Sequence, residues 1–572
     1  MARVVQASAA ALLAAAIFVG IVGASGDAPL TEAVKTGNLA AVRTLVSEGA
    51  DVNARSGDGS TPLLWAAHRS NVDAARALVA AGAMVDAAND FGVTPLLHAS
   101  RMGDAAIVDV LLQAGADPSL RHPDGATPLM LAARSGSVAA AKLLLARGAD
   151  INAIDDYQSA SALMWAAAEG HVEMAEILLE AGADPDVQAH VNPLTERHNA
   201  DFPTGGFTAL MYAARGGHED LARALMAGGA NHALRNGDGA TAAMIAIYND
   251  QFDLAATLVE LGSDPDDGSL YMAVQMRDAT TDQFAFDGSR LRPDNPNERT
   301  ALDLIRFLLE RGASPNKTFT GQMHSWSMPN SDRFDNTPFF KAAIAADVEA
   351  LKVLIEHGAD LEETPFVPEP EPGAEPEPEA DADEDAPPAG GRGRGNPNAG
   401  KTAVMVAMTG GRAPAMTGGP AYIREGEAPY REPGARNAEE AFKLLLASGA
   451  NPNATDDDGV PLLHQVARAS NLDLIRALAD AGVDFTQTDA DGKTALEVTE
   501  AAPAGRGRGG RFGGGPPGGR GRGGARASRE EVAGLLRELM GLPPAPVAEA
   551  APEADAEPAA DVESDAEAGA DE

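Results

Sequence analysis

The stretch ATPLMLAARSGSVAAAKLLLARGADIN, residues 126–152, contains the pattern that decides the fold. Two earlier stretches, which begin at Ser60 and Val93, repeat it at an interval of 33 residues. A truncated first copy begins near Ala28, and the later copies begin at Ser161, Thr208, Thr241, Gly268, Thr337, Thr402, Val460 and Thr494. A fixed period of this length predicts a repeat architecture, here of about twelve units.

Each part of the unit has a physical role. The hydroxyl of Thr127 suits a helix N-cap because it can accept a free backbone N–H. Pro128 then stands at the first helical position, where no N–H is needed. The pair Ala132–Ala133 lets a second helix pack closely, and Gly136 is predicted to end the first helix in the left-handed conformation. The second helix has apolar residues at helical spacing and ends at Gly148–Ala149, before an Asp/Asn-rich turn.

This pattern resembles the ankyrin repeat. The resemblance implies an all-α solenoid of stacked helix–turn–helix units, with hairpin loops that project to one side. Isolated units cannot bury their apolar faces, so neighbouring units supply the core. Asp250, Ala346 and Ser470 stand where the Gly that ends the first helix is expected. We expect those units to be weaker, and the unit from Thr241 to Gly268 to be the weakest.

The repeats are interrupted by segments of different composition, which we expect to be disordered. The predicted organisation is a signal peptide at 1–26, repeats at 27–361 with insertions at 186–205 and 277–298, an acidic Pro/Glu and Gly/Arg linker at 362–400, repeats at 401–542 with insertions at 410–436 and 501–527, and an acidic tail at 543–572.

The N-terminus has the features of an export signal. Arg3 precedes an apolar run from Ala9 to Val22, which is short for a membrane span, and small residues follow it. We expect a bacterial-type exported protein, periplasmic or secreted, without membrane association once the signal is removed. An uncleaved anchor helix is the alternative. The chain has no Cys, which excludes disulfides and thiolate metal sites.

The formal net charge is −40, and much of it lies in two segments without Lys or Arg. Residues 362–385 carry 11 acidic residues and residues 543–572 carry 10. Such a chain repels nucleic acid overall, so nucleic acid is not the expected partner. The exception is an Arg-Gly segment inside the last repeat. It offers nucleic-acid or weak polyanion binding as an alternative function, through Arg506, Arg508, Arg511, Arg520 and Arg522.

The sequence shows no catalytic constellation and calls for no cofactor. His171 and His218 stand at a consensus position of the resembled repeat, which favours a structural role. His190, His198 and Asp201 share one insertion, but their spacing matches no established zinc pattern, so no metal site is expected. An enzyme that uses an insertion loop remains an alternative.

The resemblance implies that a partner binds the concave face of the first helices and the hairpin loops. We therefore predict a non-catalytic scaffold for protein–protein interaction, monomeric, with a partner that is acidic where it meets the concave face. Trp65, Trp165 and Tyr212 precede the Ala pair and either pack between units or contact the partner, and His98 occupies the same position. The predicted partner-binding residues are Lys35, Arg55, His68, Arg69, Phe91, Arg101, Met102, Arg121, Arg134, Tyr157, Glu169, Arg215, Arg235 and Tyr248.

Overall fold

The computed structural model describes residues 28–192, 204–278, 297–319, 336–364, 400–408, 438–501 and 527–544. Its contacts divide the chain into two compact units, Met1–Asn451 and Pro452–Glu572, here called unit 1 and unit 2. Several predictions concern residues outside the described ranges. These are the signal peptide at 1–26, the Arg-Gly arginines, the inner parts of the insertions and linker, and the acidic tail beyond residue 544.

The first helices of the repeats begin where the Thr and Pro residues predict. The hydroxyls of Thr61, Thr94 and Thr127 each accept the backbone N–H of the third helical residue. The first helices of unit 1 are α2 (Pro29–Lys35), α4 (Pro62–His68), α6 (Pro95–Arg101), α8 (Pro128–Arg134), α10 (Ala162–Ala168), α12 (Ala209–Gly216), α14 (Ala242–Tyr248), α16 (Ser269–Asp278), α18 (Pro338–Ala345) and α20 (Ala403–Ala407).

A left-handed residue separates each of several first helices from its partner. Gly103, Gly136, Gly170 and Gly217 have φ between 68° and 76°, as the sequence predicts. The second helices of unit 1 are α3 (Leu39–Ser47), α5 (Val72–Ala80), α7 (Ala105–Gln113), α9 (Val138–Ala146), α11 (Val172–Glu180), α13 (Glu219–Ala227), α15 (Phe252–Glu260), α17 (Ala301–Glu310), α19 (Val348–Glu356) and α21 (Ala438–Ala447).

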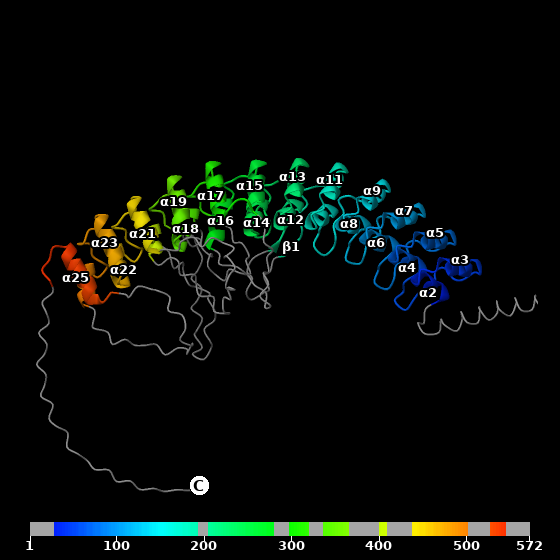
Figure 1. Cartoon of the computed structure of the whole chain (residues 1–572), viewed down its shortest axis with the longest axis horizontal. Helices are drawn as coiled ribbons and strands as arrows, with labels where there is room; N and C mark the ends of the chain where they lie inside the picture. Colours follow the sequence, from blue (N-terminus) through cyan, green and yellow to red (C-terminus); the bar gives the residue numbers. More distant parts are fainter. Residues whose placement is uncertain are drawn as a thin grey trace, which may run out of the picture. The chain divides into compact units, whose positions relative to one another are not determined.

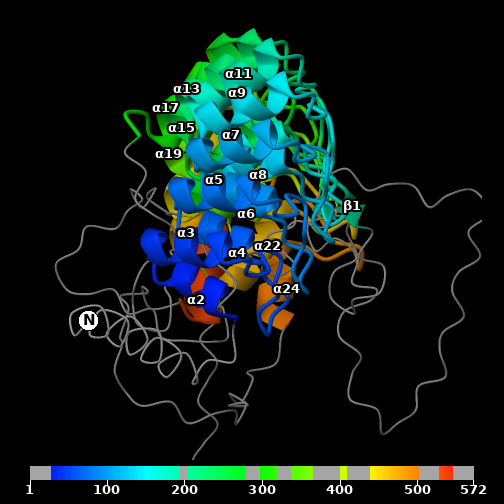
Figure 2. The same cartoon turned by 90° about the vertical axis from the view of Figure 1, so that its right-hand side faces the viewer.

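Unit 1 has two layers. Each first helix packs on the next first helix, and each second helix packs on the next second helix. Figure 1 shows the first helices of this unit on the side of the hairpin loops and the second helices on the opposite side. Figure 2 shows the hairpin loops projecting to the side on which β1 lies. The predicted all-α repeat solenoid is confirmed, with one short addition. Strands β1 (Val191–Asn192) and β2 (Thr204–Gly205) pair antiparallel, with Val191 opposite Gly205.

Small and branched apolar side chains make the core between the layers. Ala132 and Ala133 of α8 are fully buried, as are Ala141 and Leu144 of α9. The alanines bring the helices close together, and the leucine side chains fill the space that remains. Burial of one such leucine contributes about 2 kcal/mol, and every repeat adds several comparable side chains. The repeat therefore gains its stability from its neighbours.

A ladder of hydrogen bonds runs along the turns that follow the second helices. The side chain of Asn53 accepts the N–H of Met84 at 2.8 Å, and Asn152 accepts that of Asp184 at 2.9 Å. The ladder also crosses the interruptions, because Asp186 accepts the N–H of Asn231 and Glu362 accepts that of Asn451. The repeats on the two sides of these segments thus keep the stacking register of uninterrupted neighbours.

Unit 2 repeats the same arrangement on a smaller scale. Its helices are α22 (Leu462–Ala469), α23 (Leu472–Asp480), α24 (Ala495–Ala501) and α25 (Arg529–Leu539). Helix α24 packs on α25, and an ion pair of 2.7 Å joins Arg537 to Glu500. In the sequence, residues 502–526, which contain the Arg-Gly segment, lie between these two helices.

The first helices also end at the positions where another residue replaces the expected glycine. Asp250, Ala346 and Ser470 adopt left-handed φ values of 59°, 51° and 57°. A side chain in this conformation costs about 1 kcal/mol relative to glycine, which packing with neighbouring repeats offsets. The unit from Thr241 to Gly268 has both of its helices, α14 and α15. Its low stability remains a prediction.

One interruption of the repeats was not predicted from the sequence. Helix α17 ends at Glu310 and α18 begins at Pro338, and residues 311–337 separate them. The corresponding connection between α7 and α8 covers only residues 114–127. The signal was the distance from Gly312 to Thr337, which is about twice the usual distance between the Gly-Ala end of one repeat and the Thr of the next.

Candidate functional site

Two rows of side chains follow the first helices of unit 1 on the side of the hairpin loops. One row precedes the buried small residues of each helix, and the other stands three positions later, on the same helix face. The first row is Trp65, His98, Leu131, Trp165, Tyr212 and Ile245. The second row is His68, Arg101, Arg134, Ala168, Arg215 and Tyr248. Because consecutive first helices pack on one another, both rows run continuously along the unit.

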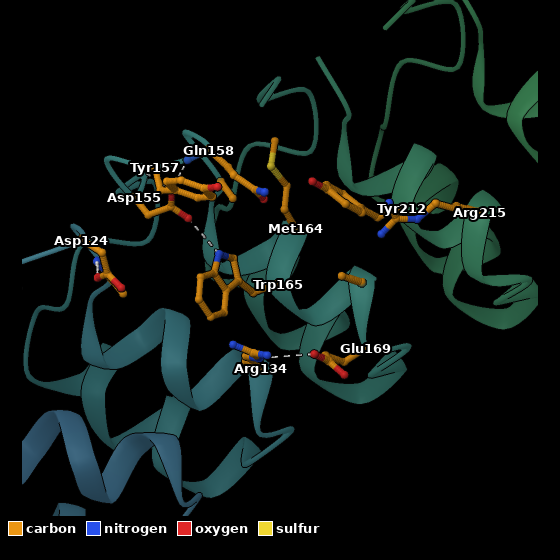
Figure 3. Close-up of a pocket in the computed structure, with 13 residues that line it drawn as sticks. Asp124, Arg134, Asp155, Tyr157, Gln158, Met164, Trp165, Glu169, Tyr212 and Arg215 are labelled. Carbon is orange, nitrogen blue, oxygen red and sulfur yellow. Dashed lines mark hydrogen bonds and ion pairs between the residues drawn. The ribbon is translucent and has the colours of Figure 1, made fainter. Parts of the chain in front are cut away.

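A cavity of about 500 Å³ opens at α8, α10 and α12, and we call it the central pocket. Its apolar part includes Met164, Trp165 and Tyr212, and Arg134 and Arg215 contribute its cations. Figure 3 shows these side chains together with Tyr157 and Gln158 of the preceding hairpin. The volume lies in the range of ligand-binding pockets. The pocket therefore has room for a large side chain or a small molecule.

Asp155 holds the hairpin and the indole ring of the pocket in place. This carboxylate is only 5% exposed. It accepts the backbone N–H groups of Tyr157 at 3.1 Å and Gln158 at 2.7 Å. Its second oxygen accepts the Nε1–H of Trp165 at 3.1 Å. Since a buried carboxylate needs several donors, this arrangement fixes both the loop and the ring.

Arg134 connects the aromatic wall to an acidic residue. Its guanidinium lies 5.2 Å from the centre of the Trp165 ring, a cation–π distance. Its Nε also lies 3.3 Å from Oε1 of Glu169. Both partners of this ion pair are about half exposed, so the pair contributes at most about 1 kcal/mol to stability. Arg134 can therefore turn toward a bound partner at little cost.

Tyr212 and Arg215 form the opposite wall. The Tyr212 ring lies 5.3 Å from the Phe207 ring, and the Arg215 guanidinium lies 5.0 Å from Tyr212. Burial raises the pKa of Tyr212, which Arg215 partly opposes, so this phenol is neutral at physiological pH. The wall thus presents an aromatic surface with a cation at its edge.

A second cavity, also of about 500 Å³, adjoins the central pocket. It is lined by Arg101, Leu131 and Ser135, and it shares Arg134 and Glu169 with the central pocket. We call the two cavities together the groove. It extends from α6 to α12 across four consecutive first helices.

Positive charge is more available than negative charge in the groove. Asp155 is buried and accepts three hydrogen bonds, and Glu169 forms an ion pair with Arg134. Asp124 lies 2.6 Å from Nδ1 of His122; burial raises the pKa of its carboxyl, but hydrogen bonds from Ala126 and His122 together outweigh burial and lower it. Within the described part of the chain, no carboxylate forms an ion pair with Arg101 or Arg215. Within the described residues no carboxylate therefore neutralises these two arginines, and each can meet an anionic group.

A chain of hydrogen bonds joins Arg101 to the N-terminal repeats. Nη2 of Arg101 lies 3.3 Å from Nδ1 of His98, and Nε2 of His98 lies 3.1 Å from Nδ1 of His68. Because a guanidinium only donates, His98 accepts at Nδ1 and donates from Nε2. Burial, Arg101 and His68 lower the pKa of His98 to about 4. Beyond His68, Lys35 lies 4.2 Å from the centre of the Trp65 ring.

The hairpin arginines serve the solenoid itself. Arg55 donates to the carbonyl of Ala88 in the next hairpin at 3.0 Å. Arg121 donates in the same way to the carbonyl of Ile154, and Arg235 to that of Asp267. Similarly, Arg69 donates to the carbonyl of Lys35 at 2.8 Å. These bonds occupy part of each guanidinium, and a role of the four arginines in partner binding remains a prediction.

The structure thus brings some of the predicted residues together and separates others. The groove is lined by five of them, Arg101, Arg134, Tyr157, Glu169 and Arg215. Lys35, His68 and Arg69 lie around α2 and α4, and Tyr248 lies on α14. Phe91, Met102 and Tyr157 are 67%, 56% and 81% exposed, so they are accessible to a partner.

Sequence reasoning missed Asp155, Gln158 and Met164 as parts of the site. A signal for Asp155 was present in the spacing. A polar residue stands nine positions before Trp65 and again before Gln465, and ten positions before Trp165. His171 has a structural contact, because its Nε2 lies 3.0 Å from the carbonyl oxygen of Arg134.

Metal ligands do not gather in the described ranges, where no three His, Asp or Glu side chains are placed to hold an ion. His190 lies inside these ranges, and His198 and Asp201 lie outside them. The helices that the structure describes include none with the length and hydropathy needed to cross a membrane.

Comparisons with known proteins identify the repeat. The family model for ankyrin repeats (3 copies) matches residues 30–122, 104–189, 190–268 and 434–506, which together exceed half of the chain. The solved ankyrin repeat domain of human ASB11 is 30% identical and covers 38% of this chain and 91% of its own, with a TM-score of 0.33. The ankyrin repeat domain of Bcl-3, a member of the IkappaB protein family, is 31% identical and covers 39% of this chain and 95% of its own, with a TM-score of 0.33. No curated protein matches the chain.

Proposed function

The chain belongs to the ankyrin repeat family, and from this premise we propose that it is a non-catalytic scaffold whose groove in unit 1 binds a partner protein. Ankyrin repeats generally mediate protein–protein interaction, and the family is generally non-catalytic. Stacked repeats of this kind use the extended surface along their first helices for binding.

The continuity of the groove is the observation that carries the proposal. Two cavities share Arg134 and Glu169, so one partner segment can lie across α6, α8, α10 and α12. The surface combines exposed arginines with Trp165, Tyr157 and Tyr212. Tryptophan, tyrosine and arginine are the residues that most often dominate the energy of protein interfaces.

The charges of the groove favour an acidic partner. Arg101 and Arg215 have no carboxylate partner among the described residues, and the carboxylates of the groove already have donors. The whole chain is strongly acidic, which opposes the approach of an acidic partner. Salt screens that repulsion beyond about 8 Å, whereas contacts inside the groove are shorter than this. The local cations therefore decide the preference.

Charge reversal in the groove tests the proposal. We expect the triple substitution Arg101→Glu, Arg134→Glu and Arg215→Glu to abolish capture of a partner from extracts of the native host. The reason is that each substitution replaces a cation that would pair with the partner's carboxylate by a carboxylate that repels it. Capture is measured by quantitative mass spectrometry with the full chain, and circular dichroism establishes that the helix content is unchanged.

The matched control reverses three cations on second helices. Arg76, Lys142 and Lys352 are exposed on α5, α9 and α19, so Arg76→Glu, Lys142→Glu and Lys352→Glu change the net charge equally. The control is expected to retain the partner. Equal loss from both triple variants would contradict a binding role for the groove. Loss only after deletion of residues 502–526 would instead favour polyanion binding by the Arg-Gly segment.

We also propose that the scaffold acts outside the cytoplasm, because residues 1–26 have the composition of an export signal. The mature chain should then begin between Ser25 and Ala28. N-terminal sequencing of the protein from the periplasm or medium of its host tests this. A chain that retains Met1 in the membrane fraction would favour the anchor alternative.

A further inference from the structure

The arginines of the groove are spaced by whole repeats. Arg101, Arg134 and Arg215 occupy the same position of α6, α8 and α12. Helix α10 lies between α8 and α12, packs on both, and has Ala168 at that position. The row therefore reads cation, cation, small residue, cation over four consecutive helices.

This spacing matches an extended peptide. Packed helices lie about 8 to 10 Å apart, which sets the distance from one repeat to the next. A chain in the extended polyproline II conformation rises about 3.1 Å per residue and has about three residues per turn, so side chains three positions apart lie on the same face. One repeat therefore corresponds to about three peptide residues, and the three arginines correspond to the first, fourth and tenth residues of a bound segment.

The gap in the row coincides with the central pocket. Ala168 leaves space where the neighbouring helices have arginine, and it lines the central pocket with Met164, Trp165 and Tyr212. Figure 3 shows the labelled side chains of α10 and α12 around this space. The seventh residue of the bound segment would face an aromatic cavity of about 500 Å³ instead of a cation. A large aromatic side chain fits such a place.

We propose that the groove binds an extended acidic segment of a partner protein, with carboxylates at its first, fourth and tenth residues and an aromatic side chain at its seventh. This inference rests on the proposed function and specifies its partner. The carboxylates meet Arg101, Arg134 and Arg215, and the aromatic ring enters the central pocket beside Trp165.

A basic segment does not suit the same groove. It would place cations against Arg101 and Arg215, whereas the exposed carboxylates of the groove, Asp124 and Glu169, already contact His122 and Arg134. A segment of the chain's own acidic tail has suitable charge. However, residues 543–572 contain no Phe, Tyr or Trp to fill the pocket. The aromatic requirement therefore favours a separate protein.

Labelled synthetic peptides test the register. The matched peptide has ten residues, with aspartate at the first, fourth and tenth positions, phenylalanine at the seventh and serine elsewhere. The control peptide has the same composition, with phenylalanine kept at the seventh position and the aspartates placed at the second, fifth and ninth positions. Fluorescence anisotropy with the full chain near physiological salt should show that the matched peptide binds at least about tenfold more tightly.

Two variants sharpen this test. Arg215→Glu should weaken the matched peptide and favour one with lysine at its tenth position. Ala168→Arg, a change at an exposed site, should reverse the preference at the seventh position from phenylalanine to aspartate. Both variants are checked by circular dichroism, and the control Lys142→Glu should leave all peptide affinities unchanged.

The outcomes separate this inference from the proposed function. Equal affinity for the matched and shifted peptides, or unchanged preferences in Ala168→Arg, would overturn the register. If partner capture were still lost in the triple groove variant, the proposed function would stand without the register. Peptide binding that appears only after residues 545–572 are deleted would overturn the inference and identify the chain's own tail as the occupant.

Discussion

Equivalent hydrogen bonds hold different side chains on helix α10 of unit 1 and helix α22 of unit 2. Nε1 of Trp165 donates to Oδ2 of Asp155 at 3.1 Å, and Nε2 of Gln465 donates to Oδ2 of Asp456 at 3.0 Å. In both helices the first aspartate of the preceding hairpin, Asp155 or Asp456, fixes the side chain. The repeat therefore supplies a general support, and the side chain placed on it decides what that position can bind.

The two regions differ in what surrounds the supported side chain. Around Trp165, the guanidinium of Arg134 lies against the ring, and Tyr212 stands on the next first helix. Gln465 instead has a second acceptor, the carbonyl oxygen of Val460 at 3.2 Å. A flat ring with a cation beside it can bind a partner's side chain, whereas an amide engaged twice within its own hairpin has little left to offer.

Removal of the support should have the largest effect. Asp155→Ala leaves two backbone N–H groups and the Trp165 Nε1–H without their acceptor, because the carboxylate is buried. We expect a loss of about 3 kcal/mol in the free energy of unfolding, measured by urea denaturation. Asp456→Ala in unit 2 should cost less, because Asp456 is only half-buried. An equal or smaller loss for Asp155→Ala would show that the hydrogen bonds of Asp155 contribute no more to stability than those of Asp456.

Replacement of the ring on an intact support should have the next largest effect. Trp165→Gln gives α10 the side chain of α22, which can keep the bond to Asp155 but removes the aromatic wall. Affinity for the partner should fall by about 2 kcal/mol, roughly thirtyfold, as expected for the loss of an interface anchor. The reciprocal change Gln465→Trp should leave partner affinity as it is. Unchanged affinity in Trp165→Gln would remove the central pocket from the account.

The pH dependence of stability should distinguish the repeat that contains His98 from its neighbour. The pKa of His98 is lowered to about 4 in the folded chain, whereas an unfolded histidine titrates near 6.5. Below pH 6.5, His98 therefore binds a proton in the unfolded chain but not in the folded chain. The free energy of unfolding falls as the pH is lowered to about 4. We expect a loss of about 2 kcal/mol from this group between pH 7 and pH 5.

The next repeat provides the matched substitution, because Leu131 occupies the place of His98. His98→Leu should flatten the decline in stability between pH 6.5 and 4, as measured by urea denaturation at several pH values. His232, on a turn away from this cluster, serves as the control in the variant His232→Gln. A decline of the same size in His98→Leu would mean that other groups cause it.

Much of the fold could be predicted because local chemistry repeats. Thr127, Pro128 and Gly136 each act within a few residues of the chain, so their roles can be read without neighbours. The left-handed Asp250 and Ala346 are different, since packing with adjacent repeats overrides the local preference. The interruption within residues 311–337 follows a regular Gly-Ala repeat end, so only the distance from Gly312 to Thr337 marks it.

The groove could be predicted only in part. The positions of Arg101, Arg134 and Arg215 follow from the repeat, and the resemblance placed them on the binding face. The hairpin arginines show the limit of this reasoning. Arg121 stands at a predicted partner-binding position, but it donates a hydrogen bond to the carbonyl of Ile154 in the next hairpin. The central pocket itself depends on Asp155, which lies in a hairpin one residue longer than the hairpin before Trp65. Such a local change alters side-chain placement in ways that the repeat pattern does not contain.

Site-specific photo-crosslinking tests the central claim most directly. A photoreactive phenylalanine analogue is placed at Ala168 in the groove or at Lys142 on the second helix α9, in the otherwise unchanged full chain. The account predicts that the partner captured from the native host forms a crosslink from position 168 and none from position 142. A crosslink from position 142 alone would show that the partner binds the opposite face, and it would contradict the groove as the binding site.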